Sequence, residues 1–377
     1  MTLKNNYNWQ EEIRKNITTA EELEKKGLIS PKKTKGLQEI IDKYPMSITN
    51  YYLSLIKENN ESDPIYKMAV ASLFEASESG SFDTSGEAAN TVTDGIQHKY
   101  PNTALILSTN MCAMYCRHCF RKRLVGQTED EILTFTDRAL DYIDAHKEID
   151  NVLISGGDSL LNSNKIIGRY LERLSKNPHI KYIRFGSRVP VVFPQRIYKD
   201  SELIELFTRY GKNKKVYVVT QFNHANEFTK EALQAINTLL SAGVPILNQT
   251  VLLAGVNDTP DTLATLFNKL AESGISPYYL FQCRPVKGVQ NYFSVPFVKS
   301  VEIVDAARAK LSGVAKRFRY CMSHIRGKME IVGLTQNKHL LLKQHQAKDM
   351  SEINRLFTAQ ITDDSNWLPD DINCESL

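Results

Sequence analysis

The stretch TALILSTNMCAMYCRHCFRKR, residues 103–123, holds the pattern that decides both the fold class and the chemistry. Its apolar start, residues 103–109, is typical of a buried strand and leads directly into three cysteines, Cys112, Cys116 and Cys119. A basic run, residues 121–123, follows them. A structural zinc site takes four ligands and disulfides use cysteines in pairs, so three thiols in one loop need a different explanation.

Similar apolar runs recur along the chain, at residues 103–109, 151–157, 182–187, 216–222, 245–253 and 277–283. Helical patterns separate them, for example at residues 165–177 and 229–243, which favours a parallel βα repeat. Such strands are buried on both faces, which explains why the runs are continuous and not alternating. Six strands are too few for a closed eight-stranded barrel, so we predict an α/β fold with a partial, TIM-like (βα)6 barrel.

The chain divides into three predicted regions. Residues 1–98 are polar with helical patterns, as in TAEELEKKG at residues 19–27, where Thr19 caps a helix and Gly27 ends it. Residues 99–310 form the barrel. Residues 311–377 form a C-terminal extension, whose residues 318–334 are strand-like but irregular.

The composition is that of an ordinary globular protein, with 42% hydrophobic and 24% charged residues among 377. The net charge is +4 and the basic residues are scattered, so we expect no nucleic-acid partner. No apolar stretch approaches the length of a membrane span, and the N-terminus lacks an apolar signal core. We therefore expect a cytoplasmic protein with no membrane partner, and reduced cysteines available for metal chemistry.

Three thiolates from one loop can hold three corners of a [4Fe–4S] cube and leave the fourth iron open. The alternative is a zinc site with His118 as the fourth ligand, although His118 stands between two of the cysteines and cannot easily fold back onto the same metal.

The pattern CxxxCxxC after the first strand resembles the radical S-adenosylmethionine (SAM) superfamily, and CAMYCRHCFRKR resembles its lysine 2,3-aminomutase group. Further motifs match in order: SGGDSLL, RFGSRVPVVFPQRI, QFNHANEFT and GVPILNQTVLLAGVND. The resemblance implies an isomerase whose cluster binds SAM and, after reduction by a one-electron donor such as ferredoxin or flavodoxin, generates a radical that takes hydrogen from an amino acid substrate. We also expect a homo-oligomer.

The resemblance assigns the SAM site to residues after several strands: Gly156, Gly157, Asp158, Arg188, His224 and Gln249. Each has a plainer explanation, since paired glycines often form a turn and a single His or Gln is often a hydrogen-bonded core residue.

The same resemblance implies pyridoxal phosphate (PLP), with Lys328 after Gly327 as the lysine that forms the imine, so the C-terminal extension becomes a PLP-binding region. An ordinary surface lysine is the alternative. Lys99 and Tyr100 stand at the phosphate-binding positions. A further arginine of the family pattern is Thr103 here, and His324 or Arg326 could supply the missing cation.

The substrate site follows from the same pattern. Arg121 matches the arginine that pairs with the α-carboxylate, whereas Lys122 and Arg123 are explained equally well by a solvated loop. Where lysine 2,3-aminomutases have two aspartates for the side-chain ammonium, this chain has Arg284 and Cys321. We therefore predict the glutamate 2,3-aminomutase activity, L-glutamate to β-glutamate.

Several alternatives stay open at this point. The substrate could be aspartate, a neutral amino acid, free lysine or a protein lysyl group. Arg284 could turn outward, or bind SAM or the PLP phosphate. A non-catalytic iron–sulfur or zinc protein is the alternative from another class.

Overall fold

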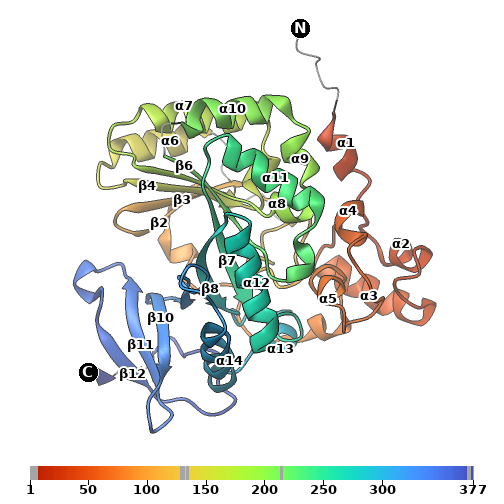
Figure 1. Ribbon diagram of the computed structural model, residues 1–377, viewed down its shortest axis with the longest axis vertical. Helices are drawn as coiled ribbons and strands as arrows, with labels where there is room; N and C mark the ends of the chain where they lie inside the picture. Colours follow the sequence, from red (N-terminus) through yellow and green to blue (C-terminus); the bar gives the residue numbers. More distant parts are fainter. Residues whose placement is uncertain (1–6, 128–131, 133–135, 213–214, 372–374, 377) are drawn as a thin grey trace.

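The computed structural model describes residues 7–127, 132, 136–212, 215–371 and 375–376, and in this part of the chain one 13-stranded sheet runs from the N-terminal to the C-terminal region (Figure 1). The spatial order of the strands is their sequence order, β1 to β13. The centre of the sheet is parallel and both ends are antiparallel.

The parallel centre consists of the six predicted strands: β3 (Thr103–Thr109), β4 (Asn151–Gly156), β5 (Tyr182–Gly186), β6 (Val216–Thr220), β7 (Ile246–Leu252) and β8 (Ser276–Gln282). A seventh strand, β9 (Arg319–His324), pairs parallel to β8. The prediction of an α/β fold with a long parallel sheet is confirmed, and the sheet is consistent with a partial barrel.

Helices between the strands pack on the outside of the sheet (Figure 1). The long ones are α6 (Thr136–Ala145), α7 (Asn164–Lys176), α10 (Ser201–Gly211), α11 (Lys230–Ser241), α12 (Pro260–Glu272) and α14 (Phe297–Ala309). In α7 the buried residues Ile167, Tyr170, Leu171 and Leu174 recur at helical spacing, and Ser163 caps the first turn. Short helices follow strand ends: η3 (Ser159–Leu161), α8 (Val189–Val192), α9 (Gln195–Tyr198), η4 (Ala225–Glu227) and α13 (Gln290–Phe293).

The N-terminal region consists mainly of helices, except at its end. Its helices are α1 (Trp9–Ile13), α2 (Ala20–Lys25), α3 (Pro31–Lys43), α4 (Asn50–Leu53), α5 (Pro64–Ala69), η1 (Leu73–Ala76) and η2 (Ala88–Asn90). Thr19 forms the predicted cap. Residues 91–100 instead form β1 (Thr91–Thr93) and β2 (Ile96–Tyr100), because Ile96 and Gln97 are buried where β2 pairs antiparallel to β3.

The C-terminal region extends the sheet with β10 (Gly327–Leu334), β11 (Leu340–Gln346), β12 (Leu356–Ala359) and β13 (Glu375–Ser376), with η5 (Met350–Glu352) between β11 and β12. β9 and β10 form a hairpin in which Lys328 pairs with Ser323. The hairpin brings Lys328 back beside the parallel strands. Within the described residues, no helix has the length and apolar character needed to cross a membrane.

Candidate active site

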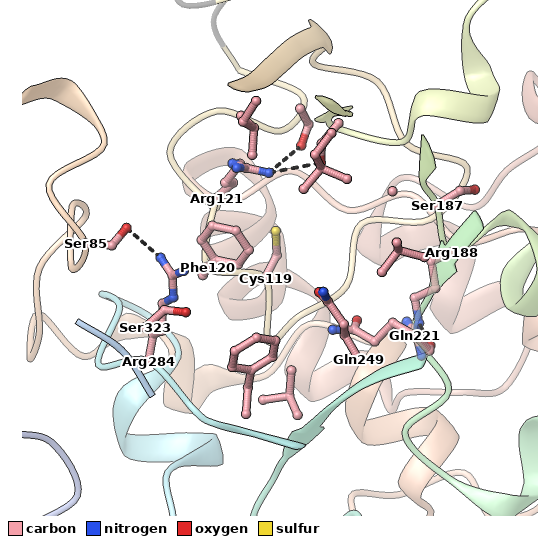
Figure 2. A pocket seen from close by; sticks show the side chains of 18 of the residues that line it. Ser85, Cys119, Phe120, Arg121, Ser187, Arg188, Gln221, Gln249, Arg284 and Ser323 are labelled. Atoms are coloured by element: carbon pink, nitrogen blue, oxygen red, sulfur yellow. Dashed lines mark hydrogen bonds between the residues drawn. The ribbon is translucent and has the colours of Figure 1, made fainter. Parts of the chain in front are cut away.

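A cavity of about 390 Å³ runs along the inner side of the sheet, from the first residues of β3 and β4 to the loops after the strand ends (Figure 2). Its wall contains every predicted site residue except His224 and Cys321. The strands, the cysteine loop and the C-terminal hairpin therefore all contribute to one cavity.

The three cysteines of the loop all lie on this wall. Burial raises the pKa of the Cys112 thiol well above its ordinary value, and the nearby Asp158 and the other two cysteines add to the shift. Burial and Cys116 raise the pKa of Cys119 to about 11. With these raised pKa values the thiols stay protonated when no metal is bound. The positive charge of bound iron would stabilise the thiolate form of each cysteine.

No three His, Cys, Asp or Glu side chains of the described residues lie close enough together to hold a single metal ion. The sulfurs of a [4Fe–4S] cluster bind separate irons and so lie farther apart than the ligands of one ion, and all three cysteines line this cavity. Arg188 donates a hydrogen bond from Nη1 to Sγ of Cys116 at 2.9 Å. The donor set fits the cluster.

His118, the possible zinc ligand, takes a different position. Its Nε2 lies 3.1 Å from Nδ2 of Asn223 and 3.3 Å from Oε1 of Gln221. Its Nδ1 is buried with no hydrogen-bond partner among the described residues. Burial and Arg188 lower the pKa of His118 to about 3, so the imidazole is neutral on the cavity wall. The ring is held through Nε2 by two side-chain amides, and no group of three His, Cys, Asp or Glu side chains in the described part of the chain is arranged to hold a zinc ion.

The basic run is not a solvated loop. Arg121 donates from Nε to Oε1 of Glu87 at 3.2 Å, and Arg123 forms an ion pair with the other oxygen at 3.1 Å. Lys122 is buried and bonds to Glu75. Arg121 still lies on the cavity wall (Figure 2), so its predicted contact with a carboxylate remains a proposal.

Glu75 joins the cysteine loop to the N-terminal region. It is fully buried and accepts bonds from Nε of Arg117 at 2.9 Å and from Nη2 at 2.6 Å, besides the bond from Lys122. Burial raises the pKa of Glu75, but the two cations outweigh burial and hold it below the ordinary value. Neither Glu75 nor Glu87 could be found from the sequence, because partners more than thirty residues apart leave no spacing pattern.

The Gly-Gly-Asp turn after β4 has a structural role. Gly156 has φ +104°, and a Cβ atom there would overlap the carbonyl oxygen of Thr109. Asp158 is buried and accepts from Oγ of Ser187 at 2.6 Å and from the backbone N–H of Arg188 at 2.7 Å. The turn thereby holds the ends of β3, β4 and β5 together, and its predicted contact with SAM remains a proposal.

Arg188 connects the cysteine loop to the end of β6. Besides Cys116 it bonds to Glu227, which is fully buried and also accepts from the hydroxyl of Tyr52 at 2.6 Å. His224 lies off the wall, where its Nδ1 accepts from the backbone N–H of Asn226 at 3.1 Å and caps η4. Gln249 of β7 reaches the wall (Figure 2).

Lys328 lies inside the cavity and is not a surface lysine. Burial lowers the pKa of its amine to about 7, and the cations Arg184, Arg284 and Lys99 act in the same direction, against Cys321. A neutral amine is the form that attacks an aldehyde. The preceding Gly327 has φ +135°, and a Cβ atom there would overlap the carbonyl oxygen of Gln346, so only glycine fits. Lys328 therefore has the properties that imine formation with PLP requires.

Lys99 and Tyr100 also lie on the wall. Nζ of Lys99 donates to the carbonyl oxygens of Ser85 at 2.9 Å and His324 at 2.7 Å, and burial lowers its pKa to about 8. His324 and Arg326, suggested as substitute cations, are absent from the wall; His324 is buried, with Nε2 3.2 Å from the carbonyl oxygen of Leu368.

Arg284 turns into the cavity and not outward (Figure 2). Its Nη1 donates to Oγ of Ser85 at 2.8 Å, and its guanidinium lies 4.0 Å from the centre of the Phe120 ring. Cys321 is fully buried and is not on the wall. Among the described residues, the only acids on the wall are Glu87 and Asp158, and both already accept bonds from the protein.

The parallel sheet, with a three-cysteine loop directly after β3, defines a radical SAM enzyme. Residues 106–267 match the family model described as the Radical SAM superfamily. The chain is 38% identical to a putative L-lysine 2,3-aminomutase of Aquifex aeolicus, covering 91% of both chains. It is 40% identical to the L-lysine 2,3-aminomutase of Acetoanaerobium sticklandii (82% of this chain, 73% of the relative) and 35% identical to the glutamate 2,3-aminomutase of Clostridioides difficile (82% and 72%).

The chain therefore belongs to the lysine 2,3-aminomutase-like group of the radical SAM superfamily. It is an aminomutase, an isomerase that uses a [4Fe–4S] cluster, SAM and PLP. When bound, the cluster and SAM supply the radical that takes hydrogen from the substrate, and PLP carries the amino group as it moves.

Proposed function

We propose that this aminomutase acts on an amino acid with an anionic side chain, L-glutamate in the first place, and moves its α-amino group to the β-carbon. The observation that carries the proposal is the charge of the cavity wall. Arg284 faces the cavity, while both acids of the described wall are already hydrogen-bonded within the protein.

Charge repulsion disfavours a lysine side chain at this site. Its ammonium would meet the guanidinium of Arg284 in a partly dehydrated space, where like charges a few ångströms apart repel by about 4 kcal/mol at an effective dielectric constant near 20. Burial lowers the pKa of Arg284, but a guanidinium stays protonated at neutral pH. A side-chain carboxylate would instead form two parallel charge-assisted bonds with it.

Two carboxylates of glutamate can then be held by two different arginines. Arg121, on the cysteine loop, is the proposed partner of the α-carboxylate, and Arg284, after β8, that of the side-chain carboxylate. The carboxylate of Glu87 interacts with both arginines. Burial raises the pKa of Glu87, but the charges of Arg121 and Arg284 outweigh burial and hold this pKa below its ordinary value. The acid keeps the arginines from repelling each other before the substrate arrives.

Lysine is the second candidate, because the comparisons favour it. The chain is 40% identical to the lysine 2,3-aminomutase of Acetoanaerobium sticklandii and 35% identical to the glutamate 2,3-aminomutase of Clostridioides difficile. Whole-chain identity mainly reports the fold and the shared cofactors, whereas the side-chain charge is decided by a few residues of the wall.

Anaerobic turnover with a panel of amino acids tests the proposal. The reconstituted enzyme, with dithionite, SAM and PLP, is incubated with glutamate, aspartate, alanine and lysine in separate reactions, and products are identified by mass spectrometry. We expect β-glutamate as the main product. Turnover of lysine without turnover of glutamate would overturn the proposed substrate.

A further inference from the structure

One cation on the cavity wall, Arg184 of β5, is assigned neither to SAM nor to the substrate. Its Nε donates to Oδ1 of Asn151 at 2.8 Å. No carboxylate of the described residues forms an ion pair with its guanidinium. The acidic groups that affect its pKa are the phenols of Tyr278 and Tyr279, and burial lowers this pKa. A cation withdrawn from water without a carboxylate partner is costly, so such a residue points to an anionic ligand.

Arg184 lies close to the position of the missing family arginine. Thr103 is the register partner of Asn151 across β3 and β4. Asn151 in turn accepts the hydrogen bond from Arg184 of the next strand. The guanidinium therefore reaches toward the starts of the strands, where position 103 offers only a hydroxyl.

The other cations of this part of the wall have contacts or proposed roles of their own. Nζ of Lys99 is bonded to two carbonyl oxygens, and Arg284 is bonded to Ser85 and stacked on Phe120. Lys328 is the proposed site of PLP attachment. Arg184 lowers the pKa of the Lys328 amine more than Arg284 or Lys99 does, so its guanidinium lies near that amine.

We propose that Arg184 binds the phosphate group of PLP in this chain and replaces the arginine that Thr103 does not supply. A guanidinium fits a phosphate because its planar fork donates parallel charge-assisted bonds to two oxygens. The inference rests on the use of PLP and is independent of which amino acid is the substrate.

Comparing PLP with pyridoxal, which lacks the phosphate, isolates the interaction. Each is titrated into the cluster-loaded enzyme after removal of PLP, and binding is followed by the visible absorbance of the cofactor. In Arg184→Gln we expect affinity for PLP to fall about tenfold to a hundredfold, as loss of a charge-assisted bond predicts, while affinity for pyridoxal is unchanged. Arg169→Gln, an exposed arginine of α7, is the control and should change neither.

Two further variants extend the test, and the first of them does not depend on the folding of Arg184→Gln. Arg184→Lys keeps the charge without the fork and should give an intermediate ratio of the two affinities. Thr103→Arg combined with Arg184→Gln should restore the preference for PLP over pyridoxal. An unchanged ratio in the folded single variants would overturn the proposal, and so would an equal loss of both affinities, because that pattern marks a purely structural role.

Discussion

The amine of Lys328 lies over the ring of Tyr279, with Nζ 4.2 Å from the ring centre. The ring shields the amine from water, and its attraction for a cation does not replace the lost hydration. Nearby cations further disfavour the protonated amine. Here Arg184, Arg284 and Lys99 add repulsion to the effect of burial, and together they lower the pKa of Lys328 to about 7.

This shift predicts how PLP attachment depends on pH. The reactive form is the neutral amine, so the rate of PLP capture should rise as pH increases through about 7 and be nearly constant above about pH 8. An ordinary lysine would still be gaining rate near pH 10. Stopped-flow mixing of PLP with the PLP-free enzyme, from about pH 5.5 to about pH 9, measures the profile. A rate that keeps rising to the end of this range would contradict the buried position.

Gly327→Ala should disturb the hairpin that carries Lys328. The new Cβ would overlap the Gln346 carbonyl oxygen in a backbone conformation that side chains rarely adopt. We expect a loss of about 1–3 kcal/mol in the free energy of unfolding and lower PLP occupancy. Gly333→Ala, on the same strand β10 but with open space around it, is the matched control and should leave both unchanged. Urea unfolding and PLP absorbance give the two readouts.

The sequence predicted the six strands, and the structure places the cysteine loop directly after β3, because apolar runs and short-range spacing depend on neighbouring residues alone. It did not predict that Lys122 and Arg123 are paired, since their partners Glu75 and Glu87 lie more than thirty residues earlier. Residues 96–100 look polar on their own and become a strand only by pairing with β3. Arg184 stands at the start of a matched motif but received no role from the sequence, because its contacts depend on Asn151 and Thr103 across two strand pairings.

Glu75→Gln should weaken both the fold and the cysteine loop. It leaves Arg117 and Lys122 buried without an anion, and breaking a buried ion pair from one side costs about 3–5 kcal/mol. Glu78→Gln, at an exposed position whose glutamate also pairs with lysines, should leave the free energy of unfolding nearly unchanged. Urea unfolding compares the two variants, and equal losses would contradict the role of Glu75.

The ion pairs of Glu75 with Arg117 and Lys122 also predict how the stability of the protein depends on pH. Because the folded state lowers the pKa of Glu75, its stabilisation is present above the ordinary glutamate pKa of about 4.5 and is lost as pH falls below it. Unfolding midpoints measured downward from about pH 6 should therefore fall more steeply for the wild type than for Glu75→Gln. Parallel curves for the two proteins would show that another carboxylate accounts for the acid sensitivity.

Arg284→Asp should act on the substrate and not on the cofactors. Loss of a charge-assisted pair, with a like charge in its place, should raise the KM for glutamate by at least about tenfold to a hundredfold. Binding of PLP should be unchanged, because the phosphate is assigned to Arg184. Arg284→Lys keeps the charge and should recover part of the affinity. Initial rates measure the substrate site, and PLP titrations measure the phosphate site. An unchanged KM for glutamate in Arg284→Asp would remove Arg284 from the substrate pocket. A loss of PLP affinity would mean that Arg284 binds the phosphate instead.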